Sequence, residues 1–260
     1  MCCLLPVLYS TISYAEVDPA ELIKNKEIGF EVTLGTQLDT RLPFTDQNGN
    51  VVTLGSLLKP GQPTLFVPMY FGCPRLCGLL INGFLQLIKE LDLKQGSEYN
   101  VVTLSFDPTE DAALALKKQE TVLHDVHRSD VTAKTWSFLT GKQEQIQALL
   151  AQAGFKYKFA EGEYLHASGF FVLTPEGKIS QYFTGIDFSP WDVRLAMVEA
   201  SNGGIGGAVD HILLYCYDFD PVRGKYTLTA FNILRFGTLF AVILFFLVAV
   251  KLSRRVARKK

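Results

Sequence analysis

The order of strand-length and helix-length patterns constrains the fold of this chain more than any other feature. Alternating runs around Asn48-Gly49 predict a β-hairpin over residues 43–54, and runs around Thr174–Gly177 predict a second over residues 169–183. Between the hairpins, apolar runs of buried-strand length alternate with helical periodicity. The predicted strands are Thr64–Tyr70, Tyr99–Phe106 and Trp136–Leu139, and the predicted helices are Leu76–Leu93, Thr109–His127 and Lys142–Ala153.

A last helix is predicted after Ser189, which suits the N-cap, with Pro190 in the first turn. Strands and helices alternate in the first part of this region, and an antiparallel hairpin follows near its end. This order predicts an α/β sandwich around a mixed sheet. We assign residues 43–201 to this domain. Residues 16–42 are predicted to be an extended leader, and residues 202–233, rich in Gly and Tyr, a linker.

The C-terminal part of the chain predicts a membrane anchor. Residues Phe236–Val250 carry no charged or strongly polar side chain, and six cations without an acid follow them. An apolar run of 15 residues is shorter than the roughly 20 that span a bilayer, so a buried core helix is the alternative. The cations favour a transmembrane helix over residues 234–252 with a basic tail over 253–260. The positive-inside rule then places the tail in the cytoplasm.

This orientation predicts a single-pass protein of the bacterial inner membrane, with its domain facing the periplasm or the cell exterior. Residues 1–15 are apolar, and Ser13 and Ala15 fit a cleavage site, although no basic n-region precedes them. They are a possible signal peptide or a loose apolar N-terminus. Six of the 25 cations follow Val250, which leaves 19 against 26 acids in the rest of the chain. This balance argues against a nucleic-acid partner.

Cys73 and Cys77 are the strongest candidates for chemistry, because they stand where the first core strand gives way to a helix. Side chains four residues apart share one helix face, so both sulfurs can reach one metal ion. A helix N-terminus also favours the thiolate, which is the form that binds metals and exchanges disulfides. Soft-metal binding and reversible dithiol chemistry are therefore both open, and a buried structural pair is the alternative.

The histidines are candidates for a third ligand. His166 lies in a predicted loop that leads into a strand, where a histidine is either a ligand or a surface residue. His124 and His127 fit a solvated face of a polar helix better than a metal site. His211 is interpreted as structural, and Cys216 as a buried cysteine rather than a resolving thiol.

Several motifs together resemble the Sco/SenC family, thioredoxin-fold factors in the assembly of respiratory copper enzymes. They are the run YFGCPRLC over Tyr70–Cys77, Asn82-Gly83 in the following helix, Ser105–Pro108 with the acid Asp111, and His166 ahead of a hairpin. The resemblance covers about residues 30–200. It implies a thioredoxin-like fold, to which the N-terminal hairpin and the C-terminal helix are added.

The resemblance also implies a site and a function. Cys73, Cys77 and His166 would bind one copper ion, Cu(I) or Cu(II), and Asp107 would line the site unless it only forms an Asp-Pro turn. Leu165 departs from the family pattern, in which an acid commonly precedes the histidine. The protein would supply copper to the dinuclear copper centre of cytochrome c oxidase, or reduce its cysteines. Its partner would be the copper-bearing oxidase subunit or another cuproprotein. A thiol–disulfide oxidoreductase of the thioredoxin type is the alternative function.

Overall fold

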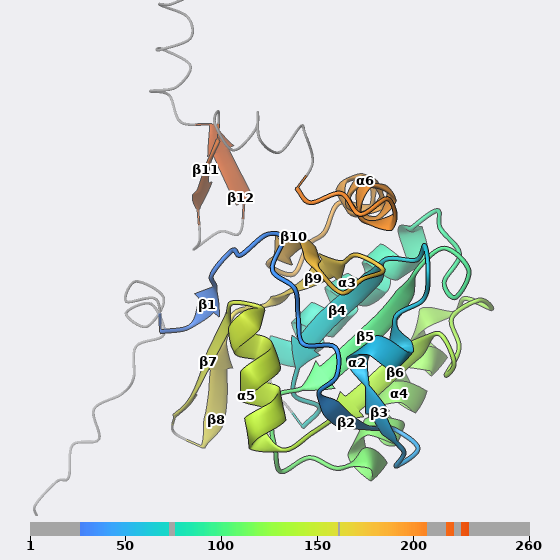
Figure 1. Cartoon of the computed structure of the whole chain (residues 1–260), viewed down its shortest axis with the longest axis vertical. Coiled ribbons are helices and arrows are strands. Elements are labelled where there is room, and N and C mark those ends of the chain that lie inside the picture. The colour runs from blue at the N-terminus through green and yellow to red at the C-terminus, as the bar shows by residue number, and fades with distance from the viewer. Residues whose placement is uncertain (1–26, 73–75, 161, 207–216, 221–224, 229–260) are drawn as a thin grey trace, which may run out of the picture.

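A seven-stranded mixed sheet forms the centre of the computed structural model (Figure 1). The structure describes residues 27–72, 76–160, 162–206, 217–220 and 225–228. The central strands β4, β5 and β6 are parallel, and the antiparallel pairs β9–β10 and β2–β3 flank them in the order β10-β9-β4-β5-β6-β2-β3. Their bounds are β2 (Pro43–Asp46), β3 (Val51–Thr53), β4 (Thr64–Met69), β5 (Asn100–Ser105), β6 (Trp136–Thr140), β9 (Gly169–Leu173) and β10 (Ile179–Thr184).

Helices cover both faces of this sheet. α3 (Leu76–Glu90) and α4 (Ala112–Val126) connect the parallel strands and lie behind the sheet in Figure 1, whereas α5 (Gln143–Gln152) lies in front of it. Right-handed crossovers between successive parallel strands place their helices on one face. α2 (Leu54–Leu57) is a single turn after β3, and α6 (Pro190–Ser201) contacts α3, β9 and β10. The predicted thioredoxin-like α/β sandwich with an added N-terminal hairpin is confirmed.

Three neighbouring strands of the sheet are fully buried. Every residue of β4, β5 and β9 is buried, as expected for strands that helices cover on both faces. Close packing between α3 and the chain ahead of α6 depends on Gly83. A Cβ atom at this position would lie 1.8 Å from the carbonyl oxygen of Ile186, so no side chain fits here.

A separate three-stranded sheet was not predicted. It consists of β1 (Gly29–Phe30), β7 (Phe155–Ala160) and β8 (Glu163–His166), in the order β1-β7-β8. The loop predicted around His166 is therefore wrong, because His166 is the last residue of β8. β1 falls within the predicted leader, and Ile28 and Leu38 nearby are buried, so this part of the leader packs against the domain. A hairpin of β11 (Tyr217–Asp220) and β12 (Lys225–Leu228) falls within the predicted linker.

The predicted signal peptide over 1–15, membrane helix over 234–252 and basic tail over 253–260 lie outside the described residues. Within the described ranges, no helix is long and apolar enough to cross a bilayer.

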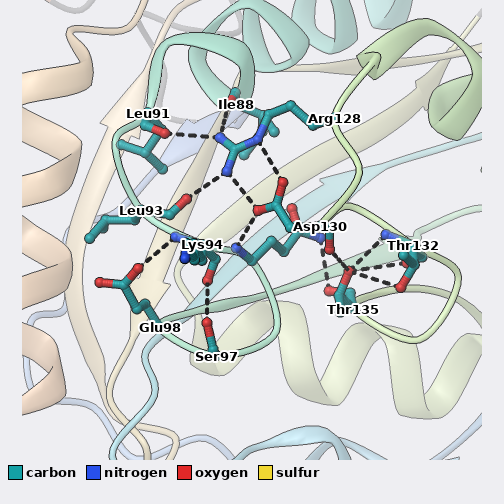
Figure 2. A network of polar contacts seen from close by, with 11 residues as sticks. Ile88, Leu91, Leu93, Lys94, Ser97, Glu98, Arg128, Asp130, Thr132 and Thr135 are labelled. Carbon is teal, nitrogen blue, oxygen red and sulfur yellow. Dashed lines mark hydrogen bonds and ion pairs between the residues drawn. The ribbon is translucent and has the colours of Figure 1, made fainter.

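Polar contacts fix the C-terminal end of α3, the helix whose first turn contains Cys77. Figure 2 shows the Arg128 guanidinium donating to backbone carbonyls at and beyond this end. Nη1 donates to Leu91 O at 2.9 Å and also to Ile88 O, and Nη2 donates to Leu93 O at 2.7 Å. Asp130 pairs with the same guanidinium at 2.7 Å. A cation at a helix C-terminus satisfies the orphan carbonyls and interacts favourably with the helix dipole.

Candidate metal centre

The two cysteines lie at the predicted strand–helix junction. β4 ends at Met69 and α3 begins at Leu76, so Cys77 is in the first turn of α3. Cys73 lies outside the described residues, as does the side chain of Cys77. Backbone amides at a helix N-terminus lack intrahelical partners and favour a thiolate nearby. The structure confirms the helix start that the sequence predicted immediately ahead of Cys77.

His166 is buried at the end of β8, with 7% of its surface exposed. Its imidazole lies among aromatic rings, with centroid distances of 5.0 Å to Phe106, 6.0 Å to Tyr70 and 6.3 Å to Phe155. Nδ1 lies 2.9 Å from the carbonyl oxygen of Ala167. A carbonyl only accepts, so we assign the hydrogen to Nδ1 and the lone pair to Nε2. Metal-binding histidines commonly have this arrangement, in which a carbonyl orients the ring.

Tyr70 connects His166 to the cysteine motif. It immediately follows β4 and begins the chain segment that leads to Cys73. Its ring lies 5.4 Å from both Phe106 and Tyr164, in addition to its contact with His166. The end of β4, the end of β5 and the strand β8 therefore meet at one place. The fold brings His166 beside the chain that leads into the Cys-x₃-Cys motif.

Sequence reasoning did not identify Tyr70, Phe106 and Tyr164 as the surroundings of the histidine. Tyr70 and Phe106 belong to the runs that carry the family resemblance, but nothing in the runs indicates that they contact His166. Among the residues whose side chains are described, no group of three His, Cys, Asp or Glu could hold a metal ion.

Asp107 forms a turn after β5, as the simpler interpretation of Asp-Pro predicted. Its Oδ1 accepts from the amide of Thr109 at 2.9 Å and from the Thr109 hydroxyl at 2.7 Å. The Asp107 carboxylate also affects Tyr164, one of the aromatic residues near His166. Burial raises the pKa of Tyr164, and the negative charge of Asp107 raises it further. Burial likewise raises the pKa of Tyr157 to about 12. These phenols are therefore neutral at physiological pH.

The other two histidines that the structure describes lie outside this region. His124 and His127 are exposed at the end of α4, where His124 pairs with Asp125 at 2.9 Å. This placement agrees with the predicted solvated face. His211 and Cys216 lie outside the described residues.

Comparisons with known proteins identify the family. The model of the SCO1/SenC family matches residues 32–196. The SCO1 protein homolog of Bacillus subtilis (strain 168) is 28% identical over 166 residues, which are 62% of this chain and 81% of that protein. A crystal structure from Aquifex aeolicus VF5 has the same fold, with a TM-score of 0.58 and 24% identity over 66% of this chain and 96% of that one. ScoI of Arabidopsis thaliana, solved with copper bound, is 18% identical with a TM-score of 0.47, covering 62% and 96%. Because the family model matches well over half of its length, this chain belongs to the SCO1/SenC family.

Proposed function

We propose that this chain binds one copper ion through Cys73, Cys77 and His166 and acts in the assembly of the dinuclear copper centre of cytochrome c oxidase. One observation carries the proposal. The buried imidazole of His166, held through Nδ1 by the carbonyl of Ala167, lies beside the segment that leads into the Cys-x₃-Cys motif. Family membership supports the same assignment.

The chemistry of these donors fits copper. Thiolates are soft ligands that suit Cu(I), and an imidazole suits Cu(II) as well as other transition metals. The aromatic residues around His166 restrict access of water to the ring, and a dry shell of this kind tunes metal affinity and redox potential. Cys73 and Cys77 would supply the two sulfurs, His166 would supply Nε2, and Asp107 would lie near the site.

The same dithiol can also act as a reductant. One thiolate attacks a sulfur of the recipient's disulfide and displaces the other sulfur as a thiolate. The second thiolate then attacks the mixed disulfide, so that a disulfide forms here and the recipient is left with two thiolates. The partner in either case is a copper-bearing oxidase subunit or another cuproprotein. In the thiol–disulfide oxidoreductase alternative, the cysteine pair suffices and His166 is incidental.

We further propose that residues 234–252 anchor the protein in the bacterial inner membrane. The apolar run over Phe236–Val250 and the six cations that follow it support this location, with the domain on the periplasmic or outer side. A protein that faces this compartment is placed where a copper centre exposed on that side could receive its metal.

Copper titration of the reduced full-length protein tests the function. Competition with a chelator should give one tightly bound Cu(I) per chain, and a C73S/C77S variant should lose it. Cys216→Ser is the matched control, because it removes a thiol outside the motif and should keep the full stoichiometry. Tight Cu(I) binding in C73S/C77S would refute the proposed ligands. Weak binding by the wild type, together with rapid disulfide exchange, would favour the oxidoreductase.

A further inference from the structure

We propose that Glu110 is a positioning residue for the Cys-x₃-Cys motif, an inference that rests on the proposed function. Glu110 lies in the turn between β5 and α4, far from the cysteines in the sequence. Its carboxylate nevertheless binds the backbone of the two residues immediately ahead of Cys73. The Glu110 Oε2 atom accepts from the amide of Phe71 at 2.8 Å, and Oε1 accepts from the amide of Gly72 at 2.6 Å.

The carboxylate is itself held in place. The hydroxyl of Ser105, the buried last residue of β5, also donates to Glu110 Oε2. Three donors therefore converge on two oxygens, and one of them belongs to the sheet. Hydrogen bonds to a carboxylate are roughly twice as strong as those between neutral groups. Glu110 thus connects the end of β5 to the segment that enters the motif.

The surroundings of Phe71 and Gly72 fit this role. A Cβ atom on Gly72 would lie only 3.2 Å from Glu110 Oε1, so glycine allows the carboxylate to approach the backbone closely. The Phe71 side chain is buried and its ring lies 5.7 Å from that of Phe138. Tyr70, just before them, contacts His166.

These contacts determine the position of the chain immediately ahead of Cys73. Side-chain packing fixes Tyr70 and Phe71, but Gly72 has no side chain, so its position depends on its backbone contacts. The bond from the Gly72 amide to Glu110 is the last contact in the described chain before Cys73. Groups that orient metal ligands commonly change metal affinity by about 10–100-fold when they are removed. Glu110 would thus help to hold Cys73 at the distance from His166 that one copper ion requires.

Glu110→Gln in the full-length protein tests this inference. Glutamine has a similar shape, but its NH₂ group cannot accept from an amide, so one of the two backbone bonds is lost. Glu120→Gln is the matched control, because it makes the same charge change on the exposed side of α4. We expect Glu110→Gln to speed hydrogen exchange at the Phe71 and Gly72 amides and to weaken Cu(I) binding about tenfold. Glu120→Gln should change neither.

Two results would overturn the inference. Unchanged exchange at both amides would show that the bonds do not hold the segment. Faster exchange with Cu(I) affinity within twofold of the wild type would make Glu110 structural only. If Glu110→Gln fails to fold, Gly72→Ala decides, because its Cβ crowds the same carboxylate and should weaken Cu(I) binding in the same direction.

Failure of the proposed function is distinguishable from failure of this inference. A wild type without a tight Cu(I) site refutes the function. The midpoint potential of the Cys73–Cys77 dithiol then tests Glu110, because displacing Cys73 changes how readily the two sulfurs form a disulfide. A potential that shifts in Glu110→Gln but not in Glu120→Gln supports the positioning role, and equal potentials in all three proteins refute it.

Discussion

At the scale of single residues, the environment of His166 distinguishes it from the other described histidines. The side chain is buried against Phe106 and Tyr70, and its Nδ1 donates to a backbone carbonyl. His124 is exposed and pairs with the neighbouring Asp125 on the same helix. A buried imidazole oriented in this way has the features of a ligand, whereas an exposed imidazole paired with a carboxylate is typical of a solvated surface.

His166→Ala should separate the two copper oxidation states. Removal of the imidazole leaves both sulfurs, so we expect Cu(II) affinity to fall by at least tenfold while Cu(I) remains bound. Chelator competition measures both affinities, and His124→Ala is the control. The dithiol should still oxidise and reduce. Equal Cu(II) affinity in the wild type and His166→Ala would exclude His166 as the third ligand.

The cysteine spacing and the resemblance to the Sco/SenC family together suggested the candidate ligands, but not their surroundings. The helical periodicity that begins at Leu76 is a local signal, and it predicted the start of α3 correctly. The contact of Tyr70 with His166 depends on how β4 and β8 are placed in the folded domain. The bonds of Glu110 to Phe71 and Gly72 have the same long-range origin. No periodicity in the sequence encodes such contacts.

At the scale of elements, the sequence predicted the strands of the main sheet well and the small sheet poorly. Buried strands such as β4 and β5 are continuous apolar runs, which are strong signals. β7 alternates Phe and Tyr with Lys, a pattern typical of a half-buried strand. We did not predict β7 from this pattern, and we predicted a loop at His166, which is the last residue of β8. β1 has only two residues, and its pairing with β7 joins segments that are far apart in the sequence.

The contacts at the end of α3 predict a pH-dependent contribution to stability. Hydrogen bonding by Arg128 lowers the pKa of the Asp130 carboxyl in the folded protein. The ion pair therefore stabilises the fold fully above the pKa of Asp130 in the unfolded chain, about 3.9. This stabilisation is lost as the pH falls through the lower folded value.

Asp130→Asn should test this contribution. At pH 7 we expect the free energy of unfolding to fall by about 1 kcal/mol, because Asp130 is partly exposed and its pair is screened by solvent. Below pH 4 the difference from the wild type should shrink. Urea unfolding across this range measures it, with the exposed Asp187→Asn as control. A difference that does not depend on pH would contradict the assigned role of the carboxylate.

At the scale of the whole molecule, the proposed topology places the domain and the basic tail on opposite sides of a membrane. We expect protease added to intact spheroplasts to digest the domain and to spare a tag placed after Lys260. The physical reason is the positive-inside rule applied to the cations that follow Val250. A domain that is protected in spheroplasts and digested only after lysis would refute the proposed topology and compartment.

In the proposed copper site, Cys73, Cys77 and His166 bind one copper ion together. X-ray absorption at the copper edge of the loaded full-length protein reports the atoms in the first shell directly. We expect two sulfur neighbours and one imidazole nitrogen in the wild type. We also expect loss of the nitrogen in His166→Ala and no change in His124→Ala. A first shell of nitrogen and oxygen without sulfur, or an imidazole that persists in His166→Ala, would refute this set of ligands.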